Sequence, residues 1–387
     1  MLIIDIGWRD ATHFTLLLKI EKIHINRYYY FLLLLLGCTS YLHEQDHLPF
    51  FKIFPYTIVS DDNEVFIKFE VNASLPLKVN EVSITPAKNK IISLSMGKLE
   101  CDKTLKLQIS DARTREEIFS RELPRIPCDD SSPIYLGFIS DTHSYFTDQH
   151  KLRKMLDKNW EYGNTNLLLH GGDIVHKGGQ IEEWEEFFAS ASPALSYRPI
   201  VSTIGNHEYQ GLGFVPGPPR VPWQFEKYLR GKTLPRSSFV ISLPQCNIII
   251  FNSNLNRMSS IDKDEQWGFI EKEMKRALAY KKAIIVLLHY PVFTSNIFKK
   301  NKPEMLELKA RLVPLLEKYK VPLVLSGDVH LYERSEKERV NYLTAGAFAW
   351  HKMLSLWGNP YQKFSKSFVT TYIWLKVTKQ KIHIKTF

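Results

Sequence analysis

Cysteine is scarce in this chain of 387 residues, and no two cysteines stand in the C-x-x-C spacing that many zinc sites use. A cysteine-ligated zinc site is therefore not expected. Cys101 and Cys128 fall in the same predicted small domain and would be able to form a disulfide in an exported protein, but the sequence leaves this pairing open. Cys246 would then be a single buried thiol.

The chain also lacks a hydrophobic run of the roughly 20 residues that a membrane-spanning helix needs. The apolar run at 28–36 has about half that length. Basic residues between 19 and 27 precede this run, and Gly37-Cys38 follows it. A basic region, a short apolar region and a small residue at a cleavage site are typical of a secretory signal peptide.

The segment Leu35-Leu36-Gly37-Cys38 resembles the cleavage box of bacterial lipoproteins. The resemblance implies that residues 1–38 form a signal ending at Cys38. This cysteine would become the lipidated first residue of an exported protein, anchored to a bacterial membrane in the periplasm or at the cell surface. The polar residues 39–49 would form a tether. The alternatives are an ordinary signal peptide, or a buried apolar strand with a chance cysteine.

No concentrated basic face is visible in the sequence, although 51 Lys and Arg outnumber 41 Asp and Glu and give a net charge of +10. The excess is scattered, with small clusters such as Lys299-Lys300-Asn301-Lys302, and such scatter is typical of a solvated surface. No nucleic-acid partner is therefore expected. The chain has no internal repeat and no low-complexity tract, and its pattern does not indicate an oligomeric state.

Two domains are predicted from a change of pattern after residue 130. Residues 50–130 carry short alternating runs separated by turn residues, which predict a small all-β sandwich of the fibronectin or immunoglobulin type. Residues 133–387 alternate strands with helices and predict a layered α/β domain. Helices are expected at 150–162, 181–191, 264–280 and 303–319, and a long loop at 211–236.

Five predicted strands of the second domain each end in side chains that can bind a metal. The segments are Asp141-Thr142-His143, Gly172-Asp173, Gly205-Asn206-His207-Glu208, His289-Tyr290-Pro291 and Gly327-Asp328-Val329-His330. An α/β sheet builds its site at the carboxyl edge of its strands. One such ending is most often a capped turn, but five in one chain indicate a two-metal hydrolase. Carboxylates, amides and imidazoles suit two divalent or trivalent ions such as Mn, Fe or Zn.

These motifs resemble the calcineurin-like metallophosphoesterase superfamily in their order, from about Pro133 to the C-terminus. Supporting segments are Asn252-Ser253 and Glu265-Gln266-Trp267. The resemblance implies a four-layer α/β sandwich that hydrolyses phosphate esters with two metal ions. It further implies that the first metal is held by Asp141, His143 and His330, that Asp173 bridges, and that the second metal is held by Asn206, His289 and Asp328.

The same resemblance implies roles for two residues that are not ligands. His207 would contact the phosphate and protonate the leaving oxygen, a general-acid role that suits imidazole. Glu208 would lie behind the ligands and orient His207.

The chain departs from the family pattern at two positions. Asp328 stands where the family usually has histidine, and an aspartate can ligate the same ion through oxygen. Purple acid phosphatases resemble this chain in their N-terminal β-sandwich and in the text 329–334, but they carry a ligand tyrosine where this chain has His176. The text 326–330 resembles phosphatase-phosphodiesterases of the D type. We therefore expect a purple-acid-phosphatase-like relative that lacks the ligand tyrosine.

Three functions fit these motifs. The expected function is a phosphatase. The alternatives are a phosphodiesterase acting on nucleotides or phospholipid head groups, because both kinds of enzyme share the motifs, or a non-catalytic surface-binding lipoprotein that keeps the fold.

Overall fold

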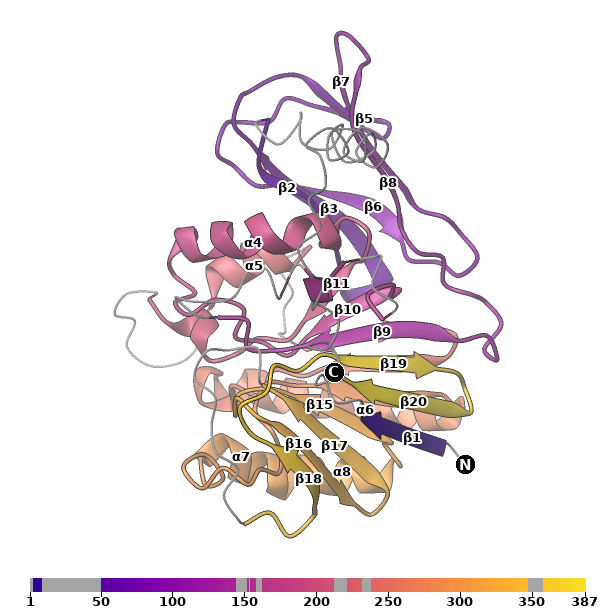
Figure 1. The fold of residues 1–387 in the computed structure, drawn as a ribbon, viewed down its shortest axis with the longest axis vertical. Coiled ribbons are helices and arrows are strands. Elements are labelled where there is room, and N and C mark those ends of the chain that lie inside the picture. Colours follow the sequence, from indigo (N-terminus) through magenta and orange to yellow (C-terminus); the bar gives the residue numbers. More distant parts are fainter. Residues whose placement is uncertain are drawn as a thin grey trace, which may run out of the picture.

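The computed structural model contains two large β-sheets packed face to face, with helices on both outer faces (Figure 1). The described residues are 3–8, 50–143, 152, 154–157, 162–211, 221–231, 238–346 and 358–387. Cys38 and the predicted tether at 39–49 lie outside them, as does most of the helix expected at 150–162.

The first sheet has nine strands and contains three of the five strands that were predicted to end at the site. In spatial order the strands are β1 (Ile3–Trp8), β20 (Lys381–Thr386), β19 (Ile373–Val377), β9 (Ile134–Ile139), β10 (Leu167–His170), β11 (Ile200–Ser202), β2 (Phe51–Val59), β3 (Glu64–Val71) and β6 (Ile92–Lys98). Strands β9, β10, β11 and β2 run parallel, so their carboxyl ends share one edge.

The second sheet has seven strands and contains the other two predicted strands. Its order is β12 (Phe239–Ser242), β13 (Cys246–Ile250), β14 (Ala283–Leu287), β15 (Leu323–Ser326), β17 (Val340–Ala345), β16 (Tyr332–Lys337) and β18 (Gln362–Lys366). The central strands β13, β14, β15 and β17 are parallel. Strands β13, β14 and β15 are buried throughout, as expected where both faces of a parallel sheet are covered.

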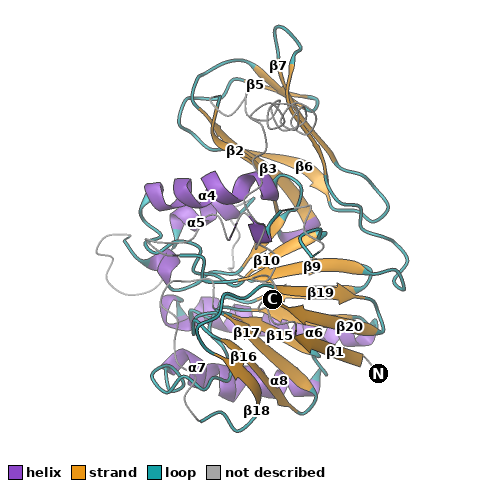
Figure 2. Ribbon diagram, viewed as in Figure 1, coloured by secondary structure: helices purple, strands orange, loops and turns teal. Residues whose placement is uncertain are grey.

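Helices cover the outer face of each sheet and complete four layers (Figure 2). Helices α4 (Ile181–Leu195) and α5 (Trp223–Leu229) pack on the nine-stranded sheet. Helices α6 (Ser260–Ala279), α7 (Pro303–Glu307) and α8 (Val313–Lys318) pack on the seven-stranded sheet. This arrangement confirms the predicted four-layer α/β fold.

Three of the expected helices are confirmed, with two differences in detail. The helix expected at 303–319 is interrupted by a π-helical segment at Leu308–Leu312. The loop expected at 211–236 contains α5, because Phe225, Tyr228 and Leu229 supply an apolar face that packs beneath α4. None of the helices in the described part of the chain has the length and apolar composition needed to cross a bilayer.

A small antiparallel sheet lies at one end of the molecule, as the sequence predicted (Figure 1). Its order is β5 (Val82–Ile84), β4 (Leu77–Val79), β7 (Lys106–Asp111) and β8 (Glu117–Glu122). Other strands from the same predicted domain, β2, β3 and β6, instead extend the nine-stranded sheet. Strand β2 joins through the pairing of Ile58 with Ile200, because Tyr56 and Ile58 are buried under α4 and α5. The N-terminal part is therefore continuous with the α/β part.

Three cysteines lie in the described part of the chain, and their states match one of the possibilities that the sequence left open. Cys101 and Cys128 form a disulfide across a separation of 27 residues, and Cys246 is a buried free thiol.

Strand β1 lies within residues 1–38, which were expected to form a signal. It pairs in parallel with β20, from Ile3 opposite Lys381 to Trp8 opposite Thr386. The apolar Ile-rich sequence at 3–6 suits a strand, and β20 offers an open sheet edge to it. The signal ending at Cys38 stays a prediction.

Candidate metal centre

The five predicted strand ends meet where the carboxyl edges of the two sheets face each other. Asp141 follows β9, Asp173 follows β10, and Asp328 follows β15. The backbone N–H of Asp328 donates to both carboxylate oxygens of Asp141, at 3.1 Å, and so joins the two sheets. Asp141, Asp173, Asp328 and His330 adopt left-handed φ values of 56°, 54°, 67° and 46°. Such conformations cost free energy in non-glycine residues and gather at functional sites.

Asp173 lies at the middle of the cluster. Its Oδ2 is 3.3 Å from Nε2 of His289, 3.7 Å from Nε2 of His143 and 3.8 Å from Nε2 of His207. Burial would raise the pKa of Asp173, but the neighbouring imidazoles, His289 first, hold it well below its usual range. A buried carboxylate surrounded by imidazole nitrogens has the position that a bridging ligand requires.

Asp141, His143 and His330 form one group whose ligand atoms all lie within 4.8 Å of one another. Nε2 of His330 is 3.4 Å from Oδ1 of Asp141, and Oδ2 of Asp141 accepts the hydroxyl of Ser140 at 2.6 Å. Within the described residues, the buried Nε2 of His143 has no hydrogen-bond partner. An orphaned buried nitrogen next to carboxylates fits a metal ligand.

Asp141, Asp173 and His289 form a second group within the same 4.8 Å limit. Nδ1 of the buried His289 donates to the carbonyl of Gly171 at 2.7 Å, which directs Nε2 toward the cluster. Oδ1 of Asn206 lies 3.2 Å from that Nε2. Burial lowers the pKa of His289, but Asp173 and the other carboxylates outweigh it and raise the value to about 10. The site therefore favours positive charge here, which a bound metal ion would supply.

Asp328 lies beside the second group but is engaged elsewhere. Its Oδ1 is 3.8 Å from Nε2 of His289, yet it binds Nζ of Lys299 at 2.9 Å and lies 3.7 Å from Nζ of Lys302. Among the described residues, Oδ2 of Asp328 is buried and has no hydrogen-bond partner. The sequence did not predict these ion pairs, because the cluster at 299–302 was expected to be part of a solvated surface.

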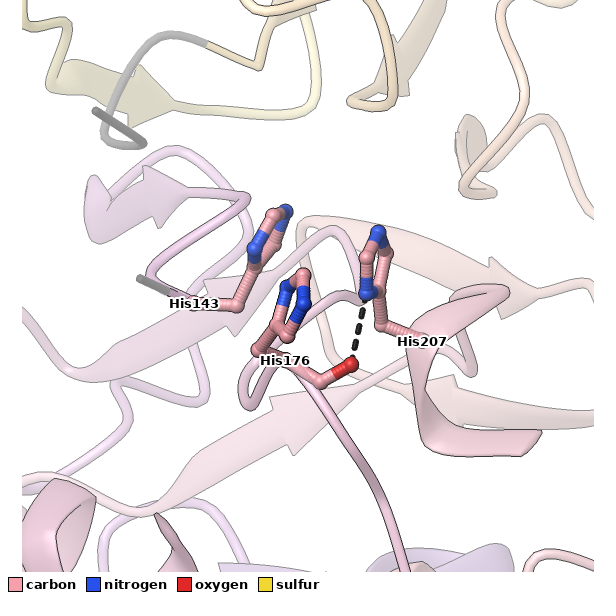
Figure 3. A group of neighbouring side chains, drawn as sticks. All are labelled: His143, His176 and His207. Carbon is pink, nitrogen blue, oxygen red and sulfur yellow. Dashed lines mark hydrogen bonds between the residues drawn. The ribbon is translucent and has the colours of Figure 1, made fainter. Parts of the chain in front are cut away.

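His207 lies at the mouth of the site, with 17% of its side chain exposed. Its ring stacks on that of His143, with centroids 4.2 Å apart, and its Nδ1 donates to the carbonyl of His176 at 2.7 Å (Figure 3). This hydrogen bond leaves Nε2 pointing toward Asp173, as a proton donor to a bound substrate requires. Ring nitrogens of His143, His176 and His207 also lie within 4.8 Å of one another, so these three imidazoles form a third group that could hold an ion.

Glu208 lies behind the cluster and binds backbone amides; that it orients the His207 ring stays a prediction. Its fully buried carboxylate accepts the backbone N–H groups of Asp173 at 2.9 Å, Ile174 at 2.7 Å and Gly205 at 2.7 Å. Glu208 points inward from a 3₁₀ turn, whereas the ring of His207 faces the site. Burial first, then Asp173, raises the pKa of Glu208 to about 7.

All the predicted site residues in the α/β part are thus brought to one place; their roles as ligands stay predictions. The fold and the site define a metallophosphoesterase-type α/β protein. The chain belongs to the calcineurin-like phosphoesterase family, whose model matches residues 134–332, just over half of the chain.

Similar proteins point to the same family. Probable purple acid phosphatase 20 of Arabidopsis thaliana is 27% identical over 184 residues, which are 45% of this chain and 40% of that protein. The chain thus spans less than half the length of this curated relative.

Two solved structures share the fold. The structure of PhoD superposes with a TM-score of 0.65 at 11% identity, covering 86% of this chain and 85% of that one. Purple acid phosphatase PPD1 from yellow lupin (Lupinus luteus) superposes with a TM-score of 0.63 at 16% identity, covering 84% of this chain and 69% of that one. At these identities the likeness concerns the fold alone.

Proposed function

We propose that the protein is a phosphatase that hydrolyses phosphate esters with two metal ions and uses His207 as its general acid. The observation that carries the proposal is the position of Asp173. Its Oδ2 lies between His143 and His289, members of two different candidate metal groups, at 3.7 and 3.3 Å. One carboxylate between two groups of ligands is the arrangement that a two-metal site needs.

The residues present fit two ions of Mn, Fe or Zn type. Asp141, His143 and His330 would hold the first, Asp173 would bridge, and Asn206 and His289 would hold the second, with Asp328 beside them. When bound, the ions supply an activated water and neutralise phosphoryl charge.

His207 supplies the proton for the leaving group, and Glu208 positions the loops that carry the site residues. The carbonyl of His176 accepts Nδ1–H of His207 and fixes the ring, so that Nε2–H can protonate the leaving alkoxide. Glu208 fixes the backbone of Asp173 and Gly205, which keeps the carboxylate and the Asn206-His207 loop in register.

The test combines metal analysis with hydrolysis of p-nitrophenyl phosphate and its bis ester. We expect two ions per chain and faster hydrolysis of the monoester. Preference for the bis ester would support the phosphodiesterase alternative, with nucleotides or phospholipid head groups as the next substrates to assay. Two bound ions without hydrolysis of either ester would refute an enzymatic role.

A non-catalytic binding protein is the second candidate, favoured by one observation. Lys299 occupies Oδ1 of Asp328, an oxygen that would otherwise face the second ion. Some matching plant relatives are named probable inactive purple acid phosphatases. The position of His207 at the site mouth supports the enzyme instead.

We also propose export and a lipid anchor on Cys38, which would place the protein at a bacterial membrane. The disulfide between Cys101 and Cys128 supports an oxidising compartment, where such bonds persist. Mass spectrometry of the membrane fraction should find a chain that starts at a lipidated Cys38. A mature chain that retains residues 1–38 would refute this proposal.

A further inference from the structure

Lys299 reaches the site from a loop that is held in place by other parts of the fold. The buried carboxylate of Glu333 accepts the N–H of Ser295 at 2.9 Å, and Oδ1 of Asn296 accepts the N–H of Phe298 at 3.0 Å. Nζ of Lys309 donates to the carbonyl of Lys300 at 2.9 Å. The lysine is therefore positioned by its loop, not by chance contact of a long surface side chain.

The ammonium of Lys299 binds Asp328 at two places. It donates to the backbone carbonyl and, at 2.9 Å, to Oδ1 of the same residue. The other oxygen, Oδ2, is buried and has no partner within the described part of the chain. One oxygen of Asp328 is thus held by a cation, while the second is left for another cation.

Asp328 and Lys299 together balance charge at the second ligand group. The aspartate adds one negative charge at a position where the family usually has a neutral histidine. Lys299 adds one positive charge next to Asp328. The other members of the group are two carboxylates and one imidazole, Asp141, Asp173 and His289, whose ligand atoms lie within 4.8 Å of one another. An ammonium held 2.9 Å from Oδ1 of Asp328 would repel a metal ion at the second position and compete with it for the Asp328 carboxylate.

We propose that Lys299 is a positioning residue that weakens binding of the second metal ion, so that the two positions fill in separate steps. This inference rests on the proposed two-metal function. The first position, at Asp141, His143 and His330, fills tightly, and the second, at Asn206, His289 and Asp328, fills weakly and exchanges its ion.

The experiment is calorimetric titration of the metal-free protein with Mn²⁺ in the absence of substrate. We compare the wild type with Lys299→Met, with Lys299→Arg, and with Lys300→Met as the matched control. The control removes the same charge from the neighbouring lysine of the same loop, which forms no ion pair with Asp328 among the described residues, whereas Lys299 and Lys302 both do. Thermal melts establish that each variant is folded.

Lys299→Met should lower the dissociation constant of the second step by about tenfold or more and leave the first step within about twofold. Lys300→Met should shift the second step by less than about threefold, and Lys299→Arg should retain the wild-type value. In an Asp328→Asn background, Lys299→Met should have a smaller effect, because the shared carboxylate is gone.

If the dissociation constant of the second step is unchanged or higher in Lys299→Met, the inference is overturned. A higher value would mean that Lys299 holds Asp328 in its ligating position. If Lys299→Met fails to fold, the same comparison is made with Lys299→Gln. The proposed function fails differently: a single binding step in both wild type and variants would refute the two-metal site itself. Shifted binding without hydrolysis would support the role of Lys299 and refute the enzyme.

Discussion

The carboxylate of Glu208 accepts the backbone N–H of Asp173 at 2.9 Å, although the two residues follow different strands. The same oxygen, Oε2, accepts the N–H of Gly205 at 2.7 Å. One buried side chain therefore fixes two loops against each other. A Cβ at Gly205 would collide with the Asp173 carboxylate, so the two loops are closely packed and a larger side chain does not fit at this position.

Glu208→Ala should lower the free energy of unfolding by about 3 kcal/mol or more, because three buried N–H groups lose their carboxyl acceptor. Urea unfolding of the metal-free protein measures this loss. Glu182→Ala, on the exposed side of α4, is the control and should change stability by less than about 0.5 kcal/mol. Equal stability of the two variants would contradict the structural role of Glu208.

His207→Ala should lower turnover of p-nitrophenyl phosphate by about 10²–10⁴, the usual contribution of a general acid. Metal content, measured by mass spectrometry, should be unaltered, since His207 is not among the proposed ligands. His176→Ala should lower turnover by less than about tenfold, because its backbone carbonyl, not its ring, holds Nδ1 of His207. Unaltered turnover in His207→Ala would rule out the acid role.

Asp173→Ala should lose metal and activity together, because the proposed bridging carboxylate would serve both ions. Metal stoichiometry after dialysis is the measurement, and Asp264→Ala, at an exposed position of α6, is the control. Retention of both ions by Asp173→Ala would refute the bridging role.

Lys68 should make stability depend on pH. The residue is buried, its Nζ donates to the carbonyl of Lys227 at 2.8 Å, and burial lowers its pKa from 10.5 to about 7. Between these values the unfolded chain binds the proton more tightly than the folded one. The contribution of Lys68 to the free energy of unfolding therefore rises from pH 7 to pH 10.5, by up to about 1.4 kcal/mol per pH unit.

Lys68→Met should remove this rise, which urea unfolding between pH 7 and pH 10 would reveal as a shallower slope than in the wild type. The exposed Lys90→Met is the control and should keep the wild-type slope. The same slope in all three proteins would show that Lys68 does not carry the effect.

Replacing Cys101 and Cys128 by alanine should lower the free energy of unfolding by about 3–4 kcal/mol, from the chain entropy of a loop with a separation of 27 residues. Reductant should destabilise the wild type by a similar amount and leave the double variant unaffected. A reductant effect in the double variant would point to another cause.

The strand ends and the family were predictable from the sequence because they depend on local pattern. The runs before Asp141, Asp173, His289 and Asp328 are rich in aliphatic residues and buried, and all but the run before His289 end at Ser, Gly or Asp residues that favour turns. The pairing of β2 with β11 was not predictable. A strand buried on both faces lacks the alternation of apolar and polar residues that would indicate which sheet it joins.

By itself, the sequence determined which side chains end the strands, and therefore the chemistry that this site can carry. Only the tertiary structure decided what those side chains contact: Glu208 binds backbone amides, and Asp328 shares its carboxylate with Lys299. The physical reason is that residue type fixes the available donors and acceptors, whereas their partners depend on loop conformations and on packing between segments far apart in the chain.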